Sequence, residues 1–203
     1  MVKPFLVLLA AAATAMAEPR LFFSKSFPGS VPAYVAITVA KDGACEYREA
    51  PDDDSPLKFQ LASAEVSEMF ALADKLDRFK RPLESPLKVA KMGMKTFRFE
   101  DGAARGEVQF NFTEDLDGRS LTDWFEKISE TSQYYIGLER TVKYDKLGVN
   151  RAVLLLQAAI ERKRVVSLPS FLPLLDRIVK NDAYLNMARS RAAGLAEGIR
   201  ASQ

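Results

Sequence analysis

Apolar and polar side chains alternate along much of the chain between residues 20 and 112, which predicts β-strands with one buried face. Tight turns at Asp42-Gly43 and Asp101-Gly102 separate neighbouring segments and therefore predict two hairpins. The predicted strands cover residues 21–23, 34–40, 44–49, 57–61, 96–100 and 107–112.

A single helix is predicted within this strand-rich part. Ser63 has the sequence position of an N-cap, and apolar residues recur at helical spacing from Val66 to about Phe79. Pro82 and Pro86 follow, and proline cannot continue a helix, so the helix is expected to end before them.

The chain is mainly helical after about residue 120. Ser120 to Asp123 resembles a capping box with aspartate in the glutamate position, which predicts the start of a helix. Residues 152–160 are apolar nearly all round and predict the most buried helix. Residues 167–169 and 181–182 divide the rest into two further helices, the last of which has one apolar side for docking.

Strands followed by helices predict an α+β fold: an antiparallel sheet with one helix in the N-terminal half, followed by a helical C-terminal half. A parallel sheet would need helices alternating with strands throughout. The predicted organisation is a strand-rich α+β part over residues 18–118 and a helical part over 119–203 packed on it. One compact domain and two closely packed halves both satisfy this pattern.

Residues 1–17 have the pattern of a secretory signal peptide. Lys3 precedes the apolar stretch Phe5 to Ala13, and Ala15-Met16-Ala17 is a small-x-small cleavage site. The apolar stretch is shorter than the ~20 residues that a membrane-spanning helix needs, so no stable membrane anchor is expected. We expect a periplasmic or extracellular bacterial protein, cleaved after Ala17.

The composition removes several kinds of chemistry. The sequence has no histidine, which excludes Ser-His-Asp and Cys-His catalysis and imidazole zinc sites. Cys45 is the single cysteine, so it forms no internal disulfide, and we predict that it is buried beside Tyr47. Without residues 1–17 the chain has 28 basic and 27 acidic side chains, a balance that does not favour nucleic-acid binding. No cofactor, metal or nucleic-acid partner is expected.

The segment 27–34 resembles part of a known family. Together with the strand and glycine turn that follow, it is similar to small exported bacterial domains of unknown function, whose first loop typically reads Cys-Phe-Gly-Thr-Cys-Pro-x-Tyr. Three residues of that loop are kept here: Gly29, Pro32 and Tyr34. Phe27 and Val31 stand in place of the two cysteines. The resemblance covers about residues 20–112 and assigns no activity.

Acidic clusters are candidates for a metal site. Thr113 to Gly118 contains the Asp-x-Asp-Gly of an EF-hand loop, but Thr113 and Trp124 occupy positions that need carboxylates. A strand-to-helix turn, with acids that favour the coming helix, is the preferred interpretation. Asp52 to Asp54 lie between prolines and are interpreted as a solvated turn.

Two Ser-x-x-Lys sequences, at residues 55–58 and 85–88, match the spacing of lysine-activated serine nucleophiles. That chemistry requires a helix and companion motifs, which the sequence does not provide, so no catalytic residue is assigned. Glu161 to Arg164 follows an apolar segment and is interpreted as a complement to the negative end of a helix.

Three functions remain open. The preferred one is a non-enzymatic binding or interaction domain for an unknown protein or envelope component, which docks on the sheet or between the two halves. The second is a carboxylate-based hydrolase of envelope glycan or peptide, with Glu114, Asp115 and Asp117 as candidates. The third is a structural component of the envelope.

The signal-peptide hypothesis predicts a mature chain that begins at Glu18, because signal peptidase cuts after the small-x-small sequence. Intact-mass spectrometry of the protein from a bacterial host checks this. A product that retains Met1, or one that stays in the cytosolic fraction, would contradict the hypothesis.

Overall fold

A computed structural model describes residues 18–202 of the chain. The predicted signal peptide and its cleavage site after Ala17 lie outside the described residues. The fold is α+β, with an antiparallel sheet and one helix in the N-terminal half and a larger helical C-terminal half, as predicted.

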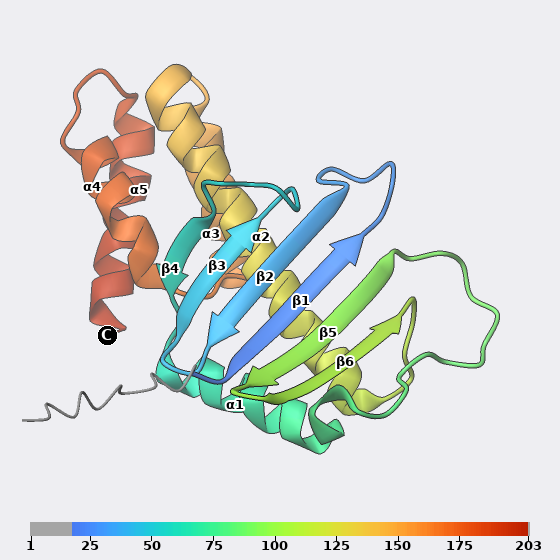
Figure 1. The fold of residues 1–203 in the computed structure, drawn as a ribbon. Helices are drawn as coiled ribbons and strands as arrows, with labels where there is room; N and C mark the ends of the chain where they lie inside the picture. Colours follow the sequence, from blue (N-terminus) through green and yellow to red (C-terminus); the bar gives the residue numbers. More distant parts are fainter. Residues whose placement is uncertain (1–17, 203) are drawn as a thin grey trace, which may run out of the picture.

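Six strands form one antiparallel sheet in the order β4-β3-β2-β1-β5-β6 (Figure 1). All six predicted strands and both hairpins are present. The strands are β1 (Arg20–Ser26), β2 (Tyr34–Ala40), β3 (Ala44–Arg48), β4 (Leu57–Gln60), β5 (Met94–Asp101) and β6 (Ala104–Phe110). The first strand therefore lies at the centre of the sheet, and β4 is one of its two edges.

One face of the sheet is buried, and the alternation of side chains determines which residues occupy it. Phe23 on β1 lies opposite both Ile37 on β2 and Phe97 on β5. Cys45 and Tyr47 of β3 share this face and are each only 1% exposed. The predicted burial of Cys45 is therefore confirmed.

No helix covers the other face of the sheet in Figure 1, and this face carries many charged side chains. Its charged side chains pair with one another: Lys58 contacts Glu46 at 3.1 Å, and Arg98 contacts Glu100 at 2.8 Å. Arg98 also lies over the ring of Phe22, 4.1 Å from its centroid. This face is therefore a surface of mutually paired charges with little free apolar area.

Helices pack on the buried face of the sheet: in Figure 1, α2 crosses behind the strands and α1 lies at their lower end. α3, α4 and α5 form a separate group beyond the β4 edge. The helical elements are α1 (Ser63–Lys75), the 3-10 turn η1 (Asp77–Phe79), α2 (Leu116–Tyr144), α3 (Val149–Glu161), the 3-10 turn η2 (Leu168–Phe171), α4 (Leu172–Val179) and α5 (Asn186–Ala201).

Two predicted helix starts are wrong, because other residues cap these helices. α2 begins at Leu116, where the Asp115 carboxylate accepts a hydrogen bond from the Gly118 N–H at 3.0 Å, so Ser120 lies inside the helix. The N-cap of α1 is Ala62, whose N–H donates to the Glu65 carboxylate at 2.9 Å. Asp115 thus satisfies a free N–H of the first turn of α2, and Glu65 satisfies the N–H of the residue just before α1.

The prediction that residues 152–160 form the most buried helix is also wrong. Leu154 and Leu155 of α3 are 46% and 47% exposed. The helix packs mainly on α2 and α5, so the apolar side that carries Leu154 and Leu155 faces solvent. The buried residues of α3 are Val149, Val153, Leu156 and Ala159.

The long helix α2 connects two hydrophobic cores. Its first half packs against the sheet and α1 through Leu121 and Phe125, and its second half packs against α3, α4 and α5 through Leu138 and Val142. We call residues 18–132 the sheet lobe and residues 133–202 the helical lobe. Within the described part of the chain, no helix is both long and apolar enough to cross a membrane.

The fold predicts that Phe125 is essential for stability. Phe125 is fully buried and stacks on Phe23, with ring centroids 4.8 Å apart. Phe125→Ala should lower the free energy of unfolding by about 3–5 kcal/mol, because it leaves a cavity between α2 and the sheet. The matched control is Leu116→Ala on the same helix, which should change stability by less than about 0.5 kcal/mol because Leu116 is 75% exposed. Urea denaturation followed by circular dichroism measures both, and equal losses would contradict the prediction.

Candidate functional site

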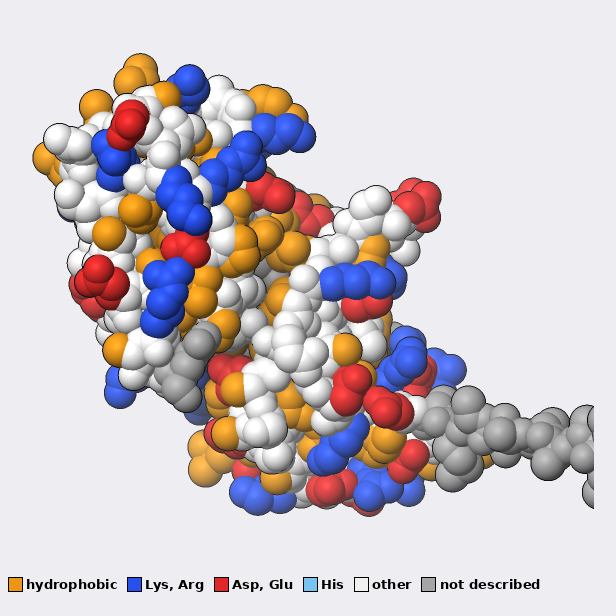
Figure 2. Space-filling model, turned by 90° about the vertical axis from the view of Figure 1, so that its left-hand side faces the viewer, with side chains coloured by type: hydrophobic (Ala, Val, Ile, Leu, Met, Phe, Trp, Pro, Cys, Tyr) orange, Lys and Arg blue, Asp and Glu red, His pale blue; other side chains and the backbone are white. Residues whose placement is uncertain are grey.

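The molecule is hollowed between the two lobes, beside the edge strand β4. Figure 2 views this side and shows hydrophobic side chains in the hollow, with lysine and arginine side chains along the helical lobe. Two neighbouring cavities, of about 350 and 570 Å³, make up this interlobe groove. Its walls come from residues 57–62, 131–135 and 165–170, with Glu65 and Ser202 at one end.

The β4 wall presents main-chain groups that point away from the sheet. The N–H of Leu61 donates to the Gly43 carbonyl at 3.0 Å, and the pairing continues as Cys45 opposite Phe59. Because main-chain groups alternate in direction along an antiparallel strand, Lys58 and Gln60 point their N–H and C=O away from β3. Their groups therefore face the groove.

Ser167 binds one of these outward-facing main-chain groups. Its hydroxyl donates a hydrogen bond to the Gln60 carbonyl at 2.6 Å and joins the helical lobe to the edge of the sheet. Ser167 has a positive φ of 50°, which is unfavourable for a residue with a side chain and marks a locally strained turn. Lys58, on the other side of this bridge, is one of the residues that line the 350 Å³ cavity.

The remaining walls are mainly apolar, and the hydroxyl groups of Thr131 and Ser132 in them already have partners. Leu57, Phe59 and Tyr135 provide apolar area, and the Tyr135 ring packs edge-on against Phe171 with centroids 5.7 Å apart. The Thr131 hydroxyl donates to a carbonyl of its own helix and accepts from the Val166 N–H at 3.0 Å. The groove therefore offers main-chain hydrogen bonding and apolar contact, which suit a bound chain segment.

An arginine holds the segment that leads into the groove against α2. Arg164 contacts Glu130 at 2.7 Å and also binds Asp123. The hydrogen bond to Glu130, with that to Asp123, raises the pKa of Arg164 despite partial burial. Partial burial alone would raise the pKa of Asp123, but hydrogen bonds from Arg164 and Lys127 outweigh it and hold the pKa below its usual range.

Charge is divided unevenly between the two lobes. The helical lobe has twelve basic and six acidic side chains, whereas the sheet lobe has 16 basic and 21 acidic ones. The net charge of the whole chain is therefore close to zero because a basic helical lobe is balanced by an acidic sheet lobe. The helical lobe forms one side of the groove, and Figure 2 shows its lysine and arginine side chains along the lobe, outside its own uncharged part of the lining.

The three carboxylates proposed for hydrolysis each contact a different side chain. Glu114 accepts a hydrogen bond from the Ser85 hydroxyl at 2.8 Å, and Asp117 contacts Lys75 at 3.4 Å. Asp115 caps α2 and contacts Arg81 at 2.6 Å; hydrogen bonds from Arg81 and from the Gly118 N–H hold its pKa below the usual range. Each carboxylate is thus directed to a different structural partner.

The other sequence candidates also have structural roles. Asp53 accepts from the Ser55 N–H at 2.9 Å in the turn before β4, where Lys58 lies on a strand and not on a helix. Ser85 is buried and binds Glu114, so it is not paired with Lys88. Among the described residues, no three metal-ligating side chains come close enough to hold an ion.

Cys45 has no sign of reactivity in this environment. Burial, and then the charges of Glu46 and Glu65, raise the pKa of the thiol far above its usual value. Because the thiolate is the reactive form, such a cysteine is inert at neutral pH.

Sequence reasoning missed two lysines on the buried face of the sheet. Lys25 follows Leu21 and Phe23 at the next inward position of β1, and Lys95 precedes Phe97 on β5. A charge at an apolar position of an alternating strand was the available signal. Tyr135 and Ser167 gave no comparable signal, because distant segments bring them to the groove.

No protein-family model matches the chain, and no curated protein is significantly similar to it. The segment 27–34, which carries the resemblance described above, connects β1 to β2. That resemblance therefore stays a prediction, and function has to be inferred from the geometry of the molecule.

The contacts of Arg164 predict a stability that depends on pH. Arg164→Gln should lower the free energy of unfolding by about 1 kcal/mol at pH 7. The effect is small because solvent screens ion pairs between partly exposed side chains. A carboxyl whose pKa is depressed in the fold stabilises above its unfolded pKa, and this stability is lost as the pH falls through the folded value. The difference in the free energy of unfolding between the wild type and Arg164→Gln should therefore become smaller below about pH 4.

Denaturation in urea at several pH values measures this difference. Lys163→Gln is the matched control, because Lys163 is exposed, lies in the same segment and has no ion pair among the described residues. A difference that stays constant from neutral to acidic pH would show that Arg164 does not act through these carboxylates.

Proposed function

We propose that the chain, after export, is a non-enzymatic binding domain that holds an extended segment of another protein in the interlobe groove. The observation that carries this proposal is the outward-facing N–H and C=O of Lys58 on the edge strand β4. An extended segment adds to such an edge as a further strand, with main-chain hydrogen bonds for affinity. The proposal places the partner between the two halves of the chain.

The walls of the groove indicate which side chains such a segment has. Leu57, Phe59 and Tyr135 face the added strand and favour apolar residues at alternate positions. A volume of about 350 Å³ lies within the range of ligand pockets, about 300–1,000 Å³. The paired charges on the open face of the sheet offer no comparable apolar surface.

The charge of the helical lobe favours a partner segment that is also acidic. This lobe forms the wall of the groove opposite β4 and has an excess of basic side chains overall, although its residues that line the groove are uncharged. Complementary charge increases the rate of encounter and selects among segments of similar shape. The expected ligand is thus an extended peptide with alternating apolar residues and acidic flanks.

Substitution of Lys58 tests the proposal. Lys58→Pro removes the outward N–H but no hydrogen bond to β3, and proline is tolerated on an edge strand when its nitrogen faces outward. Peptides selected from a phage-displayed random library should bind the wild type and should bind Lys58→Pro about tenfold more weakly. Fluorescence polarisation with the selected peptides measures the dissociation constants.

Lys58→Ala is the matched control, because it loses the same contact with Glu46 but keeps the main-chain donor. It should bind the peptides as the wild type does, and thermal melting shows that both variants are folded. Equal affinity of the proline and alanine variants, or failure to select any peptide, would overturn the proposal.

A further inference from the structure

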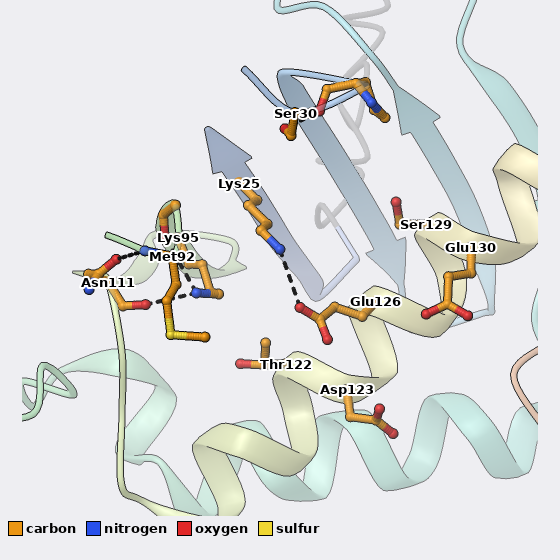
Figure 3. A network of polar contacts seen from close by, with 12 residues as sticks. Lys25, Ser30, Met92, Lys95, Asn111, Thr122, Asp123, Glu126, Ser129 and Glu130 are labelled. Atoms are coloured by element: carbon orange, nitrogen blue, oxygen red, sulfur yellow. Dashed lines mark hydrogen bonds and ion pairs between the residues drawn. The ribbon is translucent and has the colours of Figure 1, made fainter. Parts of the chain in front are cut away.

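Two lysines face one another on the buried side of the sheet. Lys25 of β1 and Lys95 of β5 are direct cross-strand partners, at the end of rows otherwise occupied by Leu21, Phe23 and Phe97. Like charges directly opposite one another destabilise a sheet, and a buried charge needs a partner. Figure 3 shows Lys25 extending toward Glu126 of α2, with Lys95 beside them.

Lys95 is buried, and its ammonium group donates hydrogen bonds only to uncharged main-chain groups. It is 6% exposed and donates to the carbonyl groups of Asn111 at 2.8 Å and Gly93 at 3.4 Å. An ammonium group has three donors, so one remains. Burial lowers the pKa of Lys95, and the charge of Lys25 lowers it further, against the effect of Glu126 and Glu84. Among the described residues, no carboxylate lies within ion-pair distance of Lys95, although Glu126 and Glu84 are near enough to act on its pKa.

Asn111 fixes the position of Lys95. Its side-chain oxygen accepts from the Met92 N–H at 2.7 Å, and its side-chain nitrogen donates to the Ala90 carbonyl at 3.0 Å. These bonds hold the loop before β5 against the end of β6 (Figure 3). The ammonium group of Lys95 is thus held in place before any ligand arrives.

The acidic residues nearby do not balance the two lysines. Glu126 contacts Lys25 at 3.4 Å, a long ion pair between partly exposed groups. Asp123 also lines this place but already binds Arg164 and Lys127. With Arg119, the lining residues carry three positive and two negative side chains, which leaves an excess of one positive charge.

The lysines border a cavity of about 270 Å³ that has an apolar side. Phe110, Phe112 and Met92 line it together with Lys25, Lys95 and Glu126. We propose that this cavity binds a monoanionic carboxylate with an apolar body, whose oxygens lie between Lys25 and Lys95 and whose carbon chain lies on Phe110 and Phe112. This lysine-pair site is separate from the interlobe groove and does not depend on the function proposed for it.

Titration calorimetry with sodium hexanoate tests the lysine-pair site. Hexanoate has the charge and the apolar body, and 1-hexanol has the same body without the charge. The wild-type protein should bind hexanoate and should not bind 1-hexanol measurably at the same concentration. Lys25→Met should weaken hexanoate binding by about tenfold, because it removes a charged hydrogen-bond donor.

Lys91→Met is the matched control, since Lys91 is an exposed lysine of the same loop outside the cavity lining, and it should bind as the wild type does. Lys95→Met is the second variant, with circular dichroism as a check on its fold; if it does not fold, Lys25→Met decides. Equal binding of 1-hexanol and hexanoate, or an unchanged affinity of Lys25→Met, would overturn the proposal. Lys58→Pro should leave hexanoate binding unchanged, which separates this test from that of the groove.

Discussion

The packing of a single continuous helix on both cores is the constraint on which the rest of the structure depends. α2 has 29 residues, a length of about 44 Å. Phe125, in its first half, stacks on the sheet, while Leu138, a few turns later, is buried among α3, α4 and α5. The helix therefore sets where the helical lobe stands beside β4, and the interlobe groove follows from that placement.

The sequence was sufficient for the elements and the fold class, because these depend on local periodicity. The alternation around Cys45 and Tyr47 identified the buried face of β3 correctly. Helix starts were predicted less well, because several residues compete to cap a first turn: Asp115 precedes Ser120 and caps α2. The exposure of Leu154 could not be predicted from the apolar sequence of α3, because exposure depends on which other elements pack around that helix.

The candidate sites were less accessible to sequence reasoning. Glu114, Asp115 and Asp117 are adjacent in the chain, yet each has a different partner, so proximity in sequence was a poor guide to shared chemistry. The groove instead combines β4 with residues such as Tyr135 and Ser167, which only tertiary packing brings together. The pair Lys25 and Lys95 was partly predictable. Each lysine interrupts an apolar pattern that is visible in the sequence, but only the strand register shows that the two lie opposite one another.

The bridge between Ser167 and the Gln60 carbonyl has a consequence for how a segment enters the groove. Together with α2 and Arg164 it fixes both walls before a ligand is present. A preformed surface loses little conformational freedom when it is occupied, so nearly all of the entropy cost falls on the incoming chain. Segments already extended in their own protein would therefore be favoured over segments that must first unfold.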